Sequence, residues 1–268
     1  MKIQMGKWVN LIKRVKNDIV SNETFAVAGE MTYKLTLSVF PLLTFSFSLI
    51  GYLNLDTPML EQQAALFLPE GVSATLFGFV NSLPTEQSTT FLSASIVVAL
   101  LTSSSGFRSM MRGINKAYGV TDNRCFFVRF LISVALALIF TATLIIAIVV
   151  LILRNALLGL LTPYVFTISN LVAFLTNLGA FGIMFVTVTI IYKMSASVKG
   201  WRSILPGSLF AVCLWVVLSQ LFNFYVNNFP VFSLYGSIAA AFILMLWFNA
   251  ISVIMLAGAQ INSSLSRQ

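Results

Sequence analysis

Side chains that could perform proton chemistry or hold a metal ion are few and scattered in this sequence. Histidine, the commonest general base and metal ligand, is absent, and no acidic residue follows Asp122. Cys125 and Cys213 lie far apart and form no CxxC motif, which argues against a disulfide framework and against a structural zinc site. The sequence therefore predicts no metal site, no cofactor and no enzymatic activity.

Glu30 is the acid whose position favours a functional role. It precedes Lys34 by four residues at the start of a long apolar stretch, and Tyr33, Ser38 and Pro41 continue roughly along the same side of a helix. A Glu at a membrane boundary that points into a helix bundle is a candidate functional residue. Alternatively, Glu30 and Lys34 form only an ion pair between adjacent turns. Pro41 predicts a kink, because it removes a backbone hydrogen bond from the helix.

Amide side chains occur inside two later apolar stretches, at Gln220, Asn223 and Asn249. Polar groups in hydrocarbon need partners, so we expect all three to face the interior of the bundle. There they either line a substrate path or only hold helices together. The candidate substrate path comprises Glu30, Tyr33, Ser38, Pro41, Gln220, Asn223 and Asn249.

A row of cations follows the second apolar stretch. Arg108, Arg112 and Lys116 are spaced i, i+4 and i+8, which puts them on one face if the helix continues, and Arg124 follows shortly after. Clustered Lys and Arg at a membrane surface suit anionic lipid head groups or other phosphates. The alternative is that these cations only fix the topology. We expect membrane lipids, above all anionic ones, to be the partners of this face.

The elements that must position these side chains are long apolar stretches. Charged residues make up only 9% of the sequence and apolar residues 58%, so most of the surface must face lipid rather than water. Each stretch reaches about 19 residues or more, enough for a helix to cross the roughly 30 Å hydrocarbon core. The stretches are continuous rather than alternating, which excludes a β-barrel. They comprise residues 35–53, 89–107, 130–153, 171–192, 204–225 and 234–261.

Lys and Arg divide unevenly between the two sides of such a bundle. Of the 16 basic residues, all but Arg154 fall in the N-terminal segment, in residues 108–129 and 193–202, or at the C-terminus. The opposite side carries four acids in one loop, residues 54–88. The positive-inside rule then predicts cytoplasmic N- and C-termini and a location in the inner or plasma membrane.

The sequence thus predicts an all-α, polytopic membrane bundle of six transmembrane helices over residues 25–264, with an external loop at 54–88 and a cytoplasmic tail at 265–268. Residues 1–24 carry Trp8, Ile12 and Ile19 at helical spacing, which predicts an interfacial amphipathic helix or, alternatively, a helix packed on cytoplasmic loops. The external loop either caps a cavity or lies in the outer interface. Residues 155–170 are too interrupted to span, and we expect an interfacial or re-entrant piece.

Three segments, in order along the chain, resemble the YihY/virulence-factor BrkB family of bacterial membrane proteins. They are AGEMTYKLTLSVFP at 28–41, SSSGFRSMMRGINKAYGV at 103–120, and residues 205–264 with PGSLFAVCLWVVLSQLFNFYV. The resemblance implies a six-span inner-membrane protein linked to envelope integrity, serum resistance or export of lipids or solutes, and an older label implies a ribonuclease. The positions that match the family pattern are Tyr33, Ser38, Pro41, Arg108, Asn115, Arg124, Pro206, Gly207, Tyr225, Tyr235, Gly236, Trp247, Gly258 and Asn262.

Two hypotheses about function follow. A nuclease needs clustered metal-binding carboxylates or a histidine acid–base pair, and the sequence has neither, so we expect no ribonuclease activity and no nucleic-acid partner. The first hypothesis is a transporter or lipid translocase in envelope maintenance, and the second is a non-transporting scaffold or envelope-integrity factor. A continuous polar cavity between the helices would favour the first, and a tightly packed bundle the second. A homo-oligomer is compatible with both.

Overall fold

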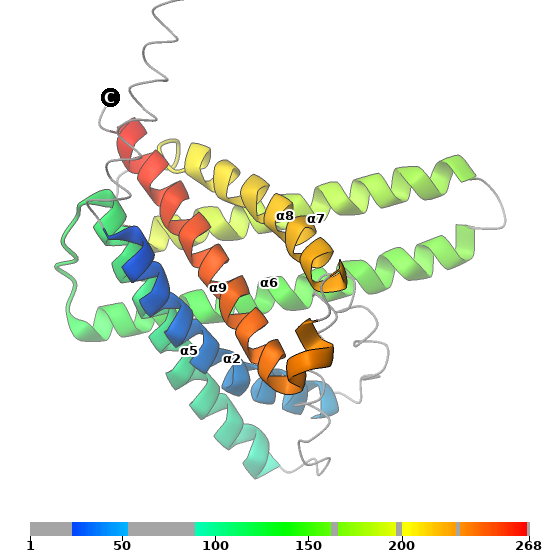
Figure 1. Ribbon diagram of the computed structural model, residues 1–268, viewed down its shortest axis with the longest axis horizontal. Helices are drawn as coiled ribbons and strands as arrows, with labels where there is room; N and C mark the ends of the chain where they lie inside the picture. Colours follow the sequence, from blue (N-terminus) through cyan, green and yellow to red (C-terminus); the bar gives the residue numbers. More distant parts are fainter. Residues whose placement is uncertain (1–22, 53–88, 162–165, 197–199, 229–230, 267–268) are drawn as a thin grey trace, which may run out of the picture.

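The computed structural model describes residues 23–52, 89–161, 166–196, 200–228 and 231–266, and within these ranges the chain is almost entirely α-helical (Figure 1). No strand occurs in these ranges, so the all-α fold class is confirmed. The helices are α2 (Thr24–Tyr52), α5 (Thr89–Tyr118), α6 (Phe126–Leu161), α7 (Phe166–Ser195), α8 (Leu205–Asn228) and α9 (Val231–Ser266).

Each predicted apolar stretch falls on one of these helices. Among the described residues, four helical segments are long and apolar enough to cross a membrane: Phe126–Ala147, Phe174–Ser195, Leu205–Tyr225 and Ala241–Ser266. The spans expected at 35–53 and 89–107 fall on α2 and α5, and a total of six spans stays a prediction. The amphipathic helix expected at 1–24 and the loop expected at 54–88 lie almost entirely outside the described residues.

The described parts of the segment 155–170 belong to two long helices and do not form a separate piece, whereas a location in the membrane interface stays a prediction. Residues 155–161 continue α6, and residues 166–170 begin α7. The sequence from Asn155 to Leu161 contains good helix formers and no proline, so nothing interrupts the backbone hydrogen bonds of α6 before Pro163. With 36 residues, α6 is about 54 Å long, and Figure 1 shows the α6–α7 hairpin projecting away from the other helices.

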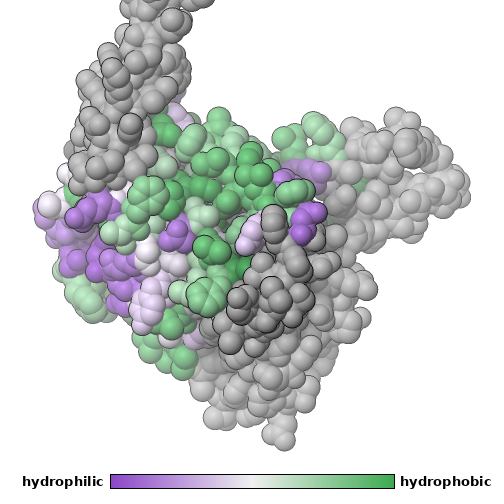
Figure 2. All heavy atoms as spheres, in the orientation of Figure 1, coloured by the Kyte–Doolittle hydropathy of each residue, from purple (hydrophilic) through white to green (hydrophobic). Residues whose placement is uncertain are grey.

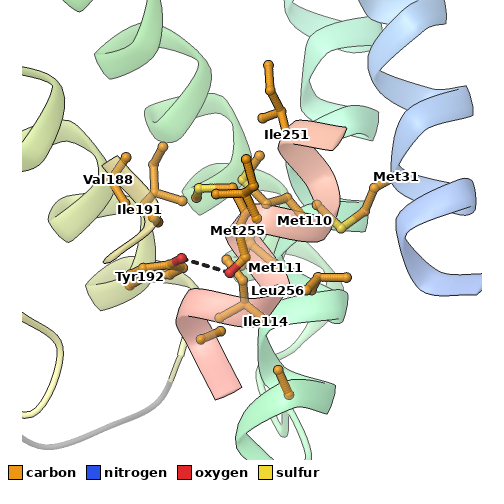
Figure 3. Packing of buried hydrophobic residues seen from close by; sticks show 14 of the residues in the cluster. Met31, Met110, Met111, Ile114, Val188, Ile191, Tyr192, Ile251, Met255 and Leu256 are labelled. Atoms are coloured by element: carbon orange, nitrogen blue, oxygen red, sulfur yellow. Dashed lines mark hydrogen bonds between the residues drawn. The ribbon is translucent and has the colours of Figure 1, made fainter. Parts of the chain in front are cut away.

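Among the residues whose side chains the structure describes, the buried core lies at one end of the bundle, which we call the packed end. It gathers the first half of α2, the last half of α5, the start of α6, the end of α7, the start of α8 and the last half of α9. Figure 3 shows Met31, Met111, Tyr192 and Met255 meeting there from four different helices. Successive helices therefore run in opposite directions through this layer, as the alternation of apolar and basic segments predicts.

Beyond the packed end, the described parts of α6, α7 and α8 expose apolar side chains. Ile146 of α6, Phe174 of α7 and Phe224 of α8 are about half exposed or more. Figure 2 shows a broad hydrophobic surface on this face of the molecule. Exposed apolar area of this extent is typical of contact with lipid.

The crossing of α8 over α9 holds the packed end together. The backbone N–H of Gly207 donates a hydrogen bond of 2.6 Å to the side-chain oxygen of Asn262, which satisfies a free N–H in the first turn of α8. A Cβ at Gly207 would collide with the backbone oxygen of Gly258, so only glycine permits the two helices to lie this close. The hydroxyl of Tyr192 donates to the backbone oxygen of Met255 at 2.7 Å (Figure 3).

Candidate functional site

Most of the candidate residues lie on α2 or on the helices beside it. α2 packs against both α5 and α9 (Figure 1), and we call these two lines of contact the α2 seam. Small residues of α5 permit the approach, because a Cβ at Gly106 would lie 3.0 Å from the hydroxyl oxygen of Ser38. The seam therefore brings polar side chains of three helices together.

The first polar level of the α2 seam lies at the beginning of α2. Lys116 of α5 contacts the carboxylate of Glu23 at 3.0 Å, with both side chains exposed. On the other side, the buried amide of Gln260 on α9 donates to the hydroxyl of Thr24 at 2.6 Å. The start of α2 is thus tied to α5 by charge and to α9 by a buried hydrogen bond.

The second polar level lies two turns further along α2. Arg112 of α5 and Lys34 both donate to the same oxygen of Glu30, each at 2.6 Å. On the opposite side of α2, the amide nitrogen of Asn249 donates to the hydroxyl of Thr32 at 3.2 Å. Both neighbours of α2 are therefore held by polar bonds at both levels.

Glu30 is an ion-pair centre at the surface rather than a group enclosed in the bundle. Its side chain is 46% exposed. The hydrogen bond from Lys34, with the positive charge of Arg112, holds the pKa of the Glu30 carboxyl below its ordinary value of 4.5, and partial burial opposes this shift. The structure contains the Glu30–Lys34 pair that was the simpler alternative, and it adds Arg112 of α5 to that pair.

The other candidates on α2 do not share one side of the helix. Tyr33 is 58% exposed and points away from the seam, whereas Ser38 is buried and donates to the backbone oxygen of Leu35 at 2.9 Å. Five residues separate these two positions, which places them about 140° apart around a helix. Pro41 is half-buried inside α2, and the helix continues past it. The expectation that Tyr33 and Ser38 lie on one face is wrong.

The amides of α8 do not join the residues of α2. Gln220 and Asn223 are exposed, whereas Asn249 lies in the α2 seam. The second half of α8 packs through one narrow strip that includes Trp215 and Phe222, and both amides lie outside that strip. The expectation that all three amides face the interior holds for Asn249 and is wrong for Gln220 and Asn223.

The cations of α5 share a continuous helix, which runs through Tyr118, but each has a partner in the protein. Arg108 lies over the rings of Phe126 and Phe130 at 5.8 Å and 5.6 Å, a cation–π geometry. Arg112 and Lys116 form the ion pairs described above. Arg124 donates to the backbone oxygen of Met194 at 2.9 Å and lies 3.8 Å from Asp122. Binding of anionic lipid at these four residues stays a prediction.

Sequence reasoning assigned no role to a group of buried polar residues at the packed end. Both amide atoms of Asn115 are buried without a hydrogen-bond partner among the described residues. Burial raises the pKa of the nearby Tyr118 hydroxyl to about 12, an effect that a hydrogen bond with Asn262 partly opposes. Pro206, Gly207, Gly258 and Asn262 matched the family pattern in the sequence, but only the fold brings Asn262 to Gly207.

Metal chemistry finds no support in the described part of the chain. There, no three His, Cys, Asp or Glu side chains lie close enough together to hold a metal ion. The acids of the α2 seam, Glu23 and Glu30, each contact a cation instead.

Comparisons with known proteins agree with the membrane fold. Residues 15–268 match the family model described as virulence factor BrkB. The chain is 26% identical to the ribonuclease-like protein YfkH of Bacillus subtilis (strain 168), over 97% of this chain and 96% of that protein. It is 25% identical to a UPF0761 membrane protein of Janthinobacterium sp. (strain Marseille), over 89% of this chain and 55% of that protein.

Another relative matches a shorter part of the chain at a higher sequence identity. Over 98 residues, 36% of this chain and 23% of the relative, the chain is 36% identical to a UPF0761 membrane protein of Xanthomonas axonopodis pv. citri (strain 306). The chain thus spans only part of the UPF0761 proteins that it resembles, but nearly all of the Bacillus protein. No solved structure matches it. The family model covers almost the whole chain, and the chain therefore belongs to the virulence factor BrkB family of membrane proteins.

Proposed function

We propose that this membrane protein moves lipid, acting as a translocase for an anionic lipid or a lipid-linked molecule. The observation that carries the proposal is the apolar surface that the described parts of three helices expose beyond the packed end. The helices are closely packed at the end that carries the cations, whereas beyond it α6, α7 and α8 expose apolar side chains. A lipid translocase needs a surface of this kind in contact with the bilayer, because the acyl chains stay in the bilayer while the head group crosses.

Within this proposal, α2 is the moving element. Before Pro41, polar bonds tie α2 to α5 and α9, through Glu30 and Thr32. Pro41 removes the hydrogen bond to the backbone oxygen of Leu37, which weakens the coupling between the two halves of α2. The path would run along the α2 seam past Glu30, Ser38 and Asn249, and the cations of α5 would attract the head group.

The proposal is tested by lipid scrambling in proteoliposomes. Purified protein is reconstituted with a trace of fluorescent phosphatidylglycerol, and dithionite then bleaches only the label in the outer leaflet. In protein-free vesicles dithionite bleaches about half of the label, because the other half lies in the inner leaflet. We expect more than half to be bleached when the wild-type protein is present, and we expect Pro41→Ala to slow the transfer of label between the leaflets. Bleaching that stops at one half with folded wild-type protein would overturn the proposal.

A second candidate, a non-transporting scaffold, draws on a different observation. A shallow recess of the α2 seam, lined by Thr24, Gly113, Lys116 and Gln260 among others, has no room for even a water-sized guest. Ligand pockets usually enclose about 300 Å³ or more. A bundle whose seam is filled in this way suits a rigid envelope protein, for which reconstituted vesicles would show no scrambling.

We also propose that the chain is not an enzyme, despite the ribonuclease-like name of its Bacillus relative. The sequence has no histidine and only eight acids, and hydrolysis of RNA requires metal-binding carboxylates or an acid–base pair. Purified protein with Mg²⁺ or Mn²⁺ should leave a labelled RNA intact for as long as a buffer control does. Cleavage that co-purifies with the folded protein would refute this.

A further inference from the structure

One polar side chain of α8 lies where hydrocarbon is expected. Gln220 is exposed, and it lies within the apolar segment Leu205–Tyr225, about 22 Å from the start of that helix. It makes no hydrogen bond to any other residue in the described ranges. A bare amide at this depth is costly, so something must cover it.

The neighbours of Gln220 on the same face form a packing surface. Four residues on this face are spaced by four, three and four positions: Leu209, Cys213, Val216 and Gln220. This spacing is typical of the contact line between two parallel helices that form a left-handed coiled coil. All four are exposed, Leu209 by 48% and Val216 by 43%. We call this line the α8 face. Its members are of medium size, which permits close helix packing.

The α8 face is separate from the strip that packs on α9. Trp215, Leu218 and Phe222 make the contacts within the chain, and the ring centroids of Phe222 and Trp247 lie 5.0 Å apart. The line from Leu209 to Gln220 lies nearly half a turn around the helix from that strip. Among the described residues, the internal packing of α8 therefore leaves the α8 face available to an external partner.

We infer that the α8 face binds the α8 face of a second copy of this chain. Two copies in one membrane point the same way, so their α8 helices meet in parallel around a two-fold axis and each residue faces its counterpart. A glutamine amide carries both a donor and an acceptor, so two Gln220 side chains satisfy each other. A lipid tail offers no such partner, whereas a second copy provides one at the required depth.

The native Cys213 provides the test, because it lies two turns before Gln220 on the same face. At a helix contact of this kind, the Cα atoms of two Cys213 residues come within about 7 Å, the limit for a disulfide. We expect the Cys125→Ser variant, in proteoliposomes treated with copper phenanthroline, to run as a dimer on non-reducing gels. The yield should persist when the protein is diluted with lipid.

The matched control moves the thiol by one residue. In the Cys125→Ser, Cys213→Ser, Leu214→Cys variant, the thiol lies at the same depth but about 100° around the helix; Leu214 is also exposed. We expect little cross-linking there. Equal yields at the two positions, or no dimer through Cys213, would overturn the inference and leave lipid or a hydrated path as the partner of Gln220.

A second variant tests the amide itself. Gln220→Leu keeps the size and exposure of the side chain but removes the hydrogen bond, and it should weaken dimerisation about tenfold, measured by single-molecule photobleaching across a range of lipid dilutions. Leu221→Ala trims the adjacent exposed side chain and should leave dimerisation unchanged. Unchanged dimerisation in Gln220→Leu would refute the role of the amide. Neither result depends on whether the protein moves lipid.

Discussion

Glu30 accepts two charged hydrogen bonds at a single oxygen, and its pKa lies below the ordinary value of 4.5. Its ionised form therefore stabilises the folded protein at neutral pH, and this contribution is lost as the pH falls through the lowered pKa. We expect Glu30→Gln to lower the apparent melting temperature at pH 7 and to match wild type below the lowered pKa. The loss should be below about 1 kcal/mol, because the ion pair is partly exposed.

The control for Glu30→Gln is the same change at Glu23. The Glu23–Lys116 pair is more exposed than the Glu30 pairs, so Glu23→Gln should shift the melting temperature less. Melting would be followed by intrinsic fluorescence in detergent from pH 3 to pH 8. A deficit of Glu30→Gln that persists unchanged at the acidic end would show that lost packing, and not lost charge, causes it.

Gly207 and Gly29 form a contrasting pair of glycines. A Cβ at Gly207 meets the backbone of Gly258, which has no room to move, whereas a Cβ at Gly29 meets nothing within 4 Å. We expect Gly207→Ala to destabilise the bundle by about 1–3 kcal/mol or to abolish folding. Gly29→Ala should be neutral or stabilising, because alanine favours a helix by up to about 1 kcal/mol over glycine. Yield of monodisperse protein and melting temperature would measure both.

At the scale of the element, we expect Pro41→Ala in α2 to have opposite effects on two properties, a higher thermal stability and a slower movement of lipid. Pro41→Ala restores a backbone hydrogen bond in the middle of α2 and should raise the melting temperature, since proline costs a helix interior about 3 kcal/mol. If the two halves of α2 must move separately, the same change should slow lipid scrambling. Gly29→Ala, in the first half of α2, should not slow it. A Pro41→Ala variant that is stable and scrambles normally would contradict the role of α2.

The basic stretch of α5 leads to a prediction about lipid. Replacing Arg108, Arg112 and Lys116 together by Gln removes three cations, each worth about 1 kcal/mol at an anionic surface. It also leaves the carboxylates of Glu23 and Glu30 without those partners. We expect the variant to retain less phosphatidylglycerol than wild type after purification, by native mass spectrometry, with weaker dependence on salt. Arg154→Gln is the control, and equal retention by all three proteins would count against the basic face.

The existence of the long helices was predictable from the sequence, because composition alone determines it. Where a helix ends and which of its sides packs were less predictable, because these depend on the rest of the fold. Length and apolarity identified the stretches that became α6, α7, α8 and α9, because a helix is the only way to satisfy such a backbone in lipid. The continuation of α6 through residues 155–161 was missed because polar residues near Asn155 suggested a break, whereas the local helix propensity is high. Gln220 was placed inside the bundle because a polar group in hydrocarbon needs a partner. Nearly every side of α8 is apolar, so no periodicity indicated which side packs.

The candidate site was partly predictable for a related reason. The spacing of Glu30 and Lys34 predicted their ion pair. The spacing of Arg108, Arg112 and Lys116 predicted one shared face on condition that the helix continues, and α5 does continue through them. The pairing of these cations with Glu23 and Glu30, and of Asn249 with Thr32, joins residues far apart in the sequence. Such contacts depend on how α2, α5 and α9 lie side by side, which no local pattern encodes.

At the scale of the whole molecule, one labelling experiment can determine on which side of the membrane the packed end lies. All six described helices bring one end to this layer, so locating any one of those ends locates them all. Cys125 is exposed next to the start of α6, in the basic region that the positive-inside rule places in the cytoplasm. In a Cys213→Ser variant, a membrane-impermeant maleimide should therefore react with Cys125 only after the membrane is opened. A reporter fused after Gln268 should likewise be active only in the cytoplasm, because α9 ends at Ser266 in the same layer. Labelling of Cys125 in intact cells would invert the orientation, and with it the leaflet that the cations of α5 face.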